Sequence, residues 1–300
     1  VVFASVQSVV RNLDLFANQF SLLVIDECHR VPDEKNSSYQ KVISHLRDIN
    51  PGIKVLGLTA TPYRLGMGWI YQYHTRGQVR SEEPRFFRDC IFELPIRYLL
   101  DEGFLTPARM IDAPVLSYDF SKLKPANTGR YKEAELDMVI EQSKRATPQI
   151  VDQIIQLAHD KQGIMVFAAT VRHAQEILGL LPVGEASIVI GDTPTLERDQ
   201  IINDFKQRKI KFLVNVSVLT TGFDAPHVDL IAILRPTESI SLYQQIVGRG
   251  LRLSDGKEEC LVLDYAGNSY DLYQPEVGDP KPDSDSEIIT IPCPACGFNN

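Results

Sequence analysis

Short apolar runs rich in β-branched residues recur along the chain, and each one ends abruptly in small or polar residues. Because these runs lack polar alternation, they predict strands that are buried on both faces, as in a parallel sheet covered by helices. The chain also opens on a run of this kind, residues 1–6, which we expect to be a strand. The other runs are residues 22–25, 53–58, 164–167, 188–190, 212–214, 230–234 and 260–263.

Helical patterns fall between the predicted strands. Thr147 and Pro148 supply an N-cap and a proline at the first helical position, and apolar residues follow them at helical spacing. Residues 196–206 and 242–251 also have helical patterns, although the glycines in the second segment weaken its C-terminal half. Strands that alternate with helices predict an α/β fold, doubly wound, with mainly parallel sheets.

A polar stretch over residues 117–146 separates an early block of predicted strands from a later one. We therefore expect one α/β domain over residues 1–112 and a second over residues 113–270. An acidic, proline-rich linker follows over residues 271–300, and its end carries the cysteines that would begin a zinc-binding module.

Composition excludes several classes of protein. The 300 residues are 44% hydrophobic and 23% charged, which excludes disorder over most of the chain. Since the sequence has no apolar run long enough to cross a bilayer and only five scattered cysteines, we expect no membrane partner and a reducing, cytoplasmic location. The net charge of −8 argues against a generally basic nucleic-acid-binding surface, but residues 271–290 concentrate that charge, so local basic grooves remain possible elsewhere.

Acidic residues directly follow the predicted strand at residues 22–25, in the order Asp26-Glu27-Cys28-His29. Ligands of open α/β sheets bind at the carboxyl ends of the strands. An apolar strand that ends in Asp-Glu is a Walker B arrangement, in which the aspartate can reach a nucleotide-bound Mg²⁺ and the glutamate can activate the attacking water. A pair of acids facing solvent at the end of a strand is the alternative that this motif alone leaves open.

Further motifs follow in a fixed order: TATP at residues 59–62, NVSVLTTGFDAP at 215–226 and QIVGRGLR at 245–252. Together with the DECH box, the set resembles the motifs of superfamily 2 helicases and translocases. MVFAATVRHA at 165–174 and ASVQS at 4–8 add to a resemblance that covers about residues 1–265. More narrowly, TATPYRLG, TTGFDAPHVDL and the CPACGF tail are similar to the RadD group of bacterial DNA-repair ATPases.

The resemblance implies two stacked RecA-like domains with ATP in the cleft between them, the first domain being incomplete at its N-terminus. It assigns Mg²⁺ coordination to Asp26, water activation to Glu27, and a contact with the TATP motif or the second domain to His29. Guanidinium groups of Arg249 and Arg252 would neutralise charge on the γ-phosphate. The remaining nucleotide contacts that it implies come from Gln245, Thr59, Thr61, Gly222 and, on the ribose, Asp224.

Nucleic acid would lie across both domains on other strand-end loops. The hydroxyl and amide groups suited to phosphate contacts there belong to Ser5, Gln7, Ser8, Thr170, Thr220 and Thr221. Serine and threonine at such positions are equally common as helix caps, so the capping alternative stays open for each of them. An aromatic stretch could offer stacking platforms for bases, but we favour core packing for its members, Trp69, Tyr71, Tyr73, Phe86 and Phe87.

Two parts of the expected machinery are not found in the sequence. The phosphate-cradling loop G-x-x-x-x-G-K-[ST] is absent, because the only Gly-Lys pair, Gly256-Lys257, is followed by Glu258. Cys293 and Cys296 are half of a Cys₄ zinc site, and the other cysteines lie in or near predicted buried strands. A metal site at the DECH box is disfavoured, because residues adjacent in sequence rarely converge on one ion.

We therefore expect an internal part of a longer enzyme, a DNA-dependent ATPase of the bacterial nucleoid that acts in DNA repair. ATP, Mg²⁺ and Zn²⁺ would be cofactors of the longer protein, whereas these residues alone are predicted to bind none of them and to be inactive. Single-stranded or branched DNA is the expected partner, with RNA still possible. The alternatives are the translocase subunit of a restriction system, or a non-hydrolysing module that binds nucleic acid or protein.

Overall fold

The computed structural model describes residues 1–17, 19–32, 36–64, 67–111, 116–126, 130–143, 146–219, 223–268 and 270–273. Its largest element is a six-stranded sheet in the order β7-β12-β11-β8-β10-β9, in which every pair of neighbouring strands is parallel. The strands are β7 (Ala108–Ile111), β8 (Gly163–Ala168), β9 (Ala186–Val189), β10 (Phe212–Asn215), β11 (Val228–Leu234) and β12 (Cys260–Asp264).

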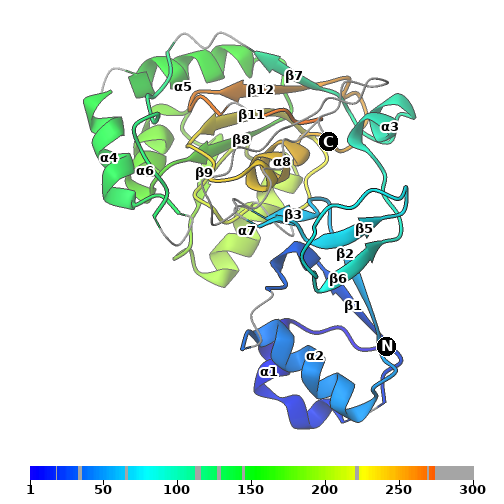
Figure 1. The fold of residues 1–300 in the computed structure, drawn as a ribbon. Helices are drawn as coiled ribbons and strands as arrows, with labels where there is room; N and C mark the ends of the chain where they lie inside the picture. Colours follow the sequence, from blue (N-terminus) through cyan, green and yellow to red (C-terminus); the bar gives the residue numbers. More distant parts are fainter. Residues whose placement is uncertain are drawn as a thin grey trace.

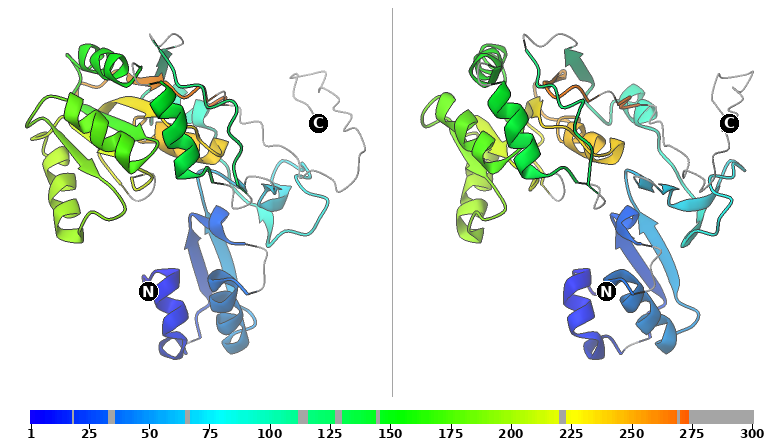
Figure 2. Two further views of the ribbon diagram at one scale, coloured as in Figure 1. Left: turned by 90° about the vertical axis from the view of Figure 1, so that its left-hand side faces the viewer. Right: turned by 60° about the vertical axis from the view of Figure 1, so that its left-hand side comes forward.

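Helices cover both faces of this sheet, as Figures 1 and 2 show. One face packs against α4 (Glu133–Gln142), α5 (Ala146–Leu157) and α6 (Val171–Leu180), and the other against α7 (Thr195–Lys206) and α8 (Ile240–Gly248). Alternate residues of each strand enter opposite cores because side chains in a strand alternate in direction. In β8, for example, Ile164 and Val166 enter the first core, whereas Met165 and Phe167 enter the second. The expected doubly wound α/β fold is confirmed.

The N-terminal part of the chain forms a smaller layer of helix and sheet. Strands β1 (Leu22–Asp26) and β2 (Lys54–Leu58) pair in parallel, and α1 (Val6–Arg11) contacts α2 (Ser38–Ile49) beside them. Short 3₁₀ helices, η1 (Leu13–Phe16) and η2 (Cys28–Arg30), complete this layer, which lies at the bottom of Figure 1.

Two expectations for this layer are wrong. The predicted strand at residues 1–6 is not formed, because the Ser5 hydroxyl accepts a hydrogen bond from the amide of Ser8 and starts α1 immediately afterwards. The strands β1 and β2 are also not buried on both faces. Leu23 and Ile25 pack towards the helices, whereas Leu22 and Val24 on the opposite face are about half exposed.

A connecting region joins the two layers and lies between them in Figure 1. It contains two small sheets, β3 (Tyr63–Arg64) with β4 (Gly68–Trp69) and β5 (Tyr71–His74) with β6 (Phe87–Cys90), followed by α3 (Ile96–Asp101). Most of its aromatic residues pack against one another: the Trp69 ring lies 5.6 Å from that of Tyr63 and 5.4 Å from that of Tyr71. The packing alternative therefore describes them better than base stacking, apart from the exposed Tyr73.

Three boundaries differ from the sequence-based expectation. Strand β7 precedes residue 112, where the first domain was expected to end, and yet it is an edge strand of the six-stranded sheet. The helix α5 begins at Ala146 rather than after a Thr147 cap, and α8 covers Ile240–Gly248 rather than residues 242–251. The division into the domains 1–112, 113–270 and 271–300 itself stays a prediction.

Candidate functional site

The DECH segment begins at the carboxyl end of β1. Asp26 is exposed there, and its Oδ1 accepts a hydrogen bond from the amide of Glu27 at 2.9 Å. Glu27 has a positive φ of 50°, in the left-handed region that costs a non-glycine residue energy and that recurs at functional sites. In the described part of the chain, Oδ2 of Asp26 has no hydrogen bond, so this carboxylate fits the hard oxygen ligand that Mg²⁺ prefers.

His29 connects the DECH segment to the TATP motif. Its Nδ1 lies 2.9 Å from Oγ1 of Thr59 and 3.4 Å from Oγ1 of Thr61. Burial, together with the nearby guanidinium groups of Arg30 and Arg64, lowers the pKa of His29 to about 4. The imidazole is therefore neutral at physiological pH, and its 3.4 Å contact with the Glu27 carboxylate is not an ion pair under those conditions. His29 makes the expected contact with TATP.

The TATP motif in turn contacts α8, a helix that packs against the six-stranded sheet. The Ser241 hydroxyl donates a hydrogen bond of 2.8 Å to Oγ1 of Thr61, and both residues are buried. Next to it, the Tyr63 hydroxyl donates to Oε1 of Gln244. Burial raises the pKa of Tyr63, so its hydroxyl keeps the proton that this bond requires. The two layers of the fold are thus joined by hydrogen bonds from Thr61 and Tyr63 to side chains of α8.

A cavity of about 230 Å³ opens beside this junction. His29, Arg30, Tyr63 and Arg64 form one wall, and Ser239, Ser241, Leu242 and Gln245 of the α8 segment form the other. Ser241 and Gln245 are four residues apart, so they share one face of α8. The structure therefore brings the candidate residue Gln245 to the DECH and TATP motifs.

The candidate arginines lie at the C-terminal end of α8. Both Arg249 and Arg252 donate hydrogen bonds to the carbonyl of Phe223, the latter at 2.8 Å, and Arg252 also pairs with Asp224 at 2.5 Å. This ion pair is partly exposed, so it contributes little to stability. The ion pair also brings Asp224, which is expected at the ribose, to Arg252, which is expected at the γ-phosphate.

Electrostatics link Arg249 to the DECH box. Burial and the neighbouring Arg252 lower the pKa of Arg249, whereas the negative charges of Glu27 and Asp224 act in the opposite direction. Glu27 from the small layer therefore lies within electrostatic reach of a buried guanidinium from the large layer. A carboxylate that can accept a proton from water, opposite a cation that can stabilise a phosphoryl group, is an arrangement suited to phosphoryl transfer.

The structure describes four of the six residues expected to contact nucleic acid. The hydroxyl groups of Ser5 and Ser8 share a hydrogen bond at the start of α1, and Gln7 is exposed there. Thr170 is 1% exposed, and its hydroxyl caps α6 by accepting a hydrogen bond from the amide of His173. The same hydroxyl donates a hydrogen bond of 2.6 Å to Oδ1 of Asp137. A phosphate contact by this side chain is therefore not supported. Several candidates lie outside the described residues: Thr220, Thr221, Gly222, Cys293 and Cys296.

The described residues contain no group of three or more His, Cys, Asp or Glu side chains that could hold a metal ion. Cys28 is buried, and that burial raises the pKa of its thiol to about 12. Its surroundings agree with the interpretation of Cys28 as a small packed residue rather than a nucleophile.

Sequence reasoning missed Arg30, Arg64, Tyr63, Ser241 and Gln244 as members of this junction. Signals for some of them were present, because Tyr63 and Arg64 directly follow TATP and Ser241 precedes Gln245 by one helical turn. The partner of each residue could not be found from sequence, since the hydrogen bonds of Tyr63 and Thr61 to α8 span 181 and 180 residues.

Comparisons with known proteins match both layers. The model of the helicase conserved C-terminal domain matches residues 146–254, and the model described as type III restriction enzyme, res subunit, matches residues 1–64. Among curated proteins, the chain is 27% identical over 276 residues to the protein named as ATP-dependent helicase IRC3 of Saccharomyces cerevisiae, covering 90% of this chain and 37% of that protein. It is 30% identical over 265 residues to the corresponding mitochondrial protein of Schizosaccharomyces pombe, covering 82% and 38%.

Solved structures show the same fold. A fragment of an HsdR subunit of a type I restriction enzyme from Vibrio vulnificus YJ016 has a TM-score of 0.61 at 22% identity, covering 92% of this chain and 50% of that one. The Mycobacterium smegmatis helicase Lhr, bound to single-stranded DNA and AMP-PNP, has a TM-score of 0.51 at 16% identity, covering 87% and 31%.

These matches and the parallel sheet define the class: the chain belongs to the superfamily 2 helicase-type proteins, and its fold is RecA-like. It spans less than two-fifths of the length of the yeast relatives. Within the described residues, no helix combines the length and apolar character that crossing a membrane requires.

Proposed function

We propose that this chain is the motor core of an ATP-dependent enzyme that moves along or remodels DNA. The observation that carries the proposal is the junction between the layers, where His29, Thr61 and Ser241 form a continuous set of polar contacts. The negative charge of Glu27 also opposes the lowering of the Arg249 pKa there. ATP-dependent activity is part of the names of the yeast relatives, and the Lhr structure contains single-stranded DNA.

In the proposed reaction Asp26 would hold Mg²⁺, and Glu27 would accept a proton from the attacking water. Arg249 would stabilise the negative charge that develops on the phosphoryl oxygens. Neutral His29 keeps Glu27 oriented through its contacts with Thr59 and Thr61. Arg252 would exchange its present partner, Asp224, for a phosphate oxygen once ATP is bound. Asp224 is then released for the ribose.

The phosphate-cradling loop is not in this sequence, so we propose that the complete site requires residues outside it. Backbone N–H groups wrapped around the phosphates and a lysine supply most of the affinity for nucleotide in such sites. The 300 residues alone are therefore predicted to bind ATP weakly and to be inactive. Cys293 and Cys296 would ligate Zn²⁺ only together with further ligands.

A role in DNA repair rests on the sequence motifs shared with the RadD group. The translocase subunit of a restriction system is a second candidate, because residues 1–64 match the res subunit family and the fold matches an HsdR fragment. A cytoplasmic, nucleoid-associated location would agree with both the DNA-repair role and the restriction role. A non-hydrolysing binding module is disfavoured, since Asp26, Glu27, Arg249 and Arg252 are all in place.

The test is ATP turnover by the full-length protein with single-stranded DNA, duplex DNA, RNA or no nucleic acid. We expect DNA to raise the rate, and a stronger response to RNA would overturn the DNA assignment. Absence of turnover under all four conditions would overturn the enzymatic proposal. DNA cleavage that depends on ATP would decide for the restriction alternative.

A further inference from the structure

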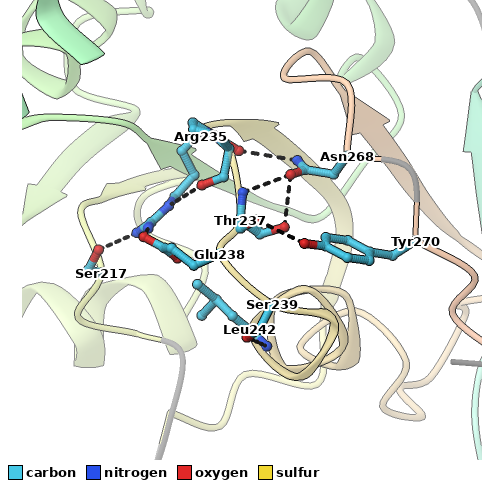
Figure 3. Close-up of polar contacts among 9 residues, drawn as sticks. Ser217, Arg235, Thr237, Glu238, Ser239, Leu242, Asn268 and Tyr270 are labelled. Atoms are coloured by element: carbon cyan, nitrogen blue, oxygen red, sulfur yellow. Dashed lines mark hydrogen bonds and ion pairs between the residues drawn. The ribbon is translucent and has the colours of Figure 1, made fainter. Parts of the chain in front are cut away.

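A buried ion pair lies directly after β11, outside the residues assigned to the reaction. Nη2 of Arg235 lies 2.9 Å from Oε1 of Glu238, and the exposed fractions of these side chains are 9% and 14%. Nη1 of Arg235 also donates a hydrogen bond to the hydroxyl of Ser217, as Figure 3 shows. The guanidinium group therefore joins the segment after β10 to the segment after β11.

Ser217 is an unusual partner. It has a positive φ of 56°, one of three non-glycine residues with positive φ in the described part of the chain, and it is exposed. A left-handed conformation is unfavourable for a residue with a Cβ, so the surrounding structure must hold it in place. Ser217 belongs to the motif at residues 215–226 that the sequence analysis placed beside nucleotide and nucleic acid.

On its other side the ion pair borders the start of α8. Glu238 directly precedes Ser239, whose hydroxyl caps α8 by accepting a hydrogen bond of 3.2 Å from the amide of Leu242. The same helix carries Ser241 and Gln245 into the junction and ends beside Arg249. A shift of Glu238 would therefore change where α8 begins.

A different residue anchors the backbone of this loop. Oδ1 of Asn268 accepts hydrogen bonds of 2.7 and 2.8 Å from the amide and hydroxyl of Thr237, and its Nδ2 donates to the carbonyl of Arg235 and to Asp264, both at 3.2 Å. Figure 3 shows that Tyr270 also contacts Thr237. Asn268 thus fixes the loop to the end of β12, whereas among the described residues the connection to Ser217 comes from the Arg235 side chain.

We propose that Arg235 is a positioning residue that transmits the conformation of residues 216–219 to α8, and so makes phosphoryl transfer responsive to nucleic acid. The inference rests on the proposed function, because it gives that function a regulatory connection. Arg235 contacts neither ATP nor nucleic acid in this account. A buried ion pair suits the task since breaking either partner leaves an uncompensated charge, which disfavours intermediate arrangements.

The structural part of the proposal can be tested on the 300-residue chain by amide hydrogen exchange. In Ser217→Ala, we expect the amides of Leu242 and Tyr243 to exchange about tenfold faster than in the wild type, although the sequence places Ser217 more than 20 residues before α8. Ser187→Ala on β9 is the matched control, because the Ser187 hydroxyl has no hydrogen-bond partner among the described residues. Unchanged exchange at both amides in Ser217→Ala would overturn the proposal.

The functional part uses ATP turnover by the full-length protein. The double variant Arg235→Gln/Glu238→Gln avoids a lone buried charge, and we expect it to keep its rate without DNA while losing about tenfold of the stimulation by DNA. Asn268→Ala should instead lower both rates by a similar factor, because it loosens the loop itself. Equal losses with and without DNA in the double variant would overturn the proposal. If the wild type shows no response to DNA, the proposed function fails, and the exchange experiment alone decides whether the connection exists.

Discussion

Gly250 lies between the two candidate arginines and has no space for a side chain. A Cβ at this position would lie 2.2 Å from Sγ of Cys260, 3.0 Å from Cδ1 of Ile231 and 3.1 Å from Cβ of Cys260. Both neighbours are fully buried in the six-stranded sheet, so neither can move into solvent. Gly250→Ala must therefore displace the segment that carries Arg249 or deform strands β11 and β12.

The size of the effect follows from this geometry. Carbon and sulfur atoms pack at about 3.5–4 Å, so the contact with Sγ has to open by more than an ångström. Adding a methylene to a well-packed core costs about 1–3 kcal/mol. Each kcal/mol lowers the melting temperature of a unit of this size by about 2–4 °C, so we expect a decrease of about 2–12 °C for Gly250→Ala.

Gly248 is the matched control, two residues earlier in the same motif. A Cβ there meets nothing within 4 Å, and the residue is the last of α8. Gly248→Ala should leave the melting temperature unchanged or raise it, since alanine favours the helix by up to about 1 kcal/mol. In addition, Cys260→Ala should cost less in the Gly250→Ala background than in the wild type, because it removes the clashing sulfur atom.

Thermal unfolding of the four variants, followed by circular dichroism, measures these differences. Equal melting temperatures for Gly250→Ala and Gly248→Ala would refute the close approach of residue 250 to β12. Strict additivity of Gly250→Ala and Cys260→Ala would refute the identity of the clashing atom.

Three further predictions concern the site and its surroundings. In the full-length protein, Arg252→Ala should lower kcat by at least about a hundredfold if the guanidinium group acts on the γ-phosphate, and a change confined to KM would contradict that role. Burial lowers the pKa of His173 to about 4, so the unfolded chain binds more protons than the folded one between that pH and about 6.5. The free energy of unfolding should therefore fall as the pH drops through this range. His173→Asn should show a shallower decline, and identical slopes for the variant and the wild type would contradict this prediction. Calorimetric titration of the 300-residue chain with a non-hydrolysable ATP analogue should give no binding at micromolar concentrations, whereas a micromolar Kd would show that the missing phosphate loop is not needed.

The sequence predicted the large sheet well because buried parallel strands have an unmistakable pattern. Residues 164–167, 212–214, 230–234 and 260–263 all lie within strands of the six-stranded sheet. The same pattern failed at residues 1–6, where a serine cap outweighed the β-branched residues and started a helix. Local capping chemistry can decide between helix and strand when few tertiary contacts oppose it.

The candidate site was only partly accessible from sequence. Motif resemblance supplied Glu27, His29 and Arg249. The structure places His29 at the junction, and the charge of Glu27 acts on the pKa of Arg249. Motif resemblance could not supply the ion pair of Arg235, since the role of this residue depends on its contact with Ser217, 18 residues earlier in the chain. Contacts between separate strand-end loops arise from sheet order, which a local pattern does not contain.

The central claim is that Glu27 and Arg249 complete one catalytic site across the junction of the two layers. Its most direct test is the comparison of kcat and ATP affinity in the full-length protein with Glu27→Gln. The account predicts that turnover is abolished while ATP binding is retained, because the substitution removes the base and keeps the Mg²⁺ ligand Asp26. A loss of ATP affinity equal to the loss of rate would contradict the assigned roles.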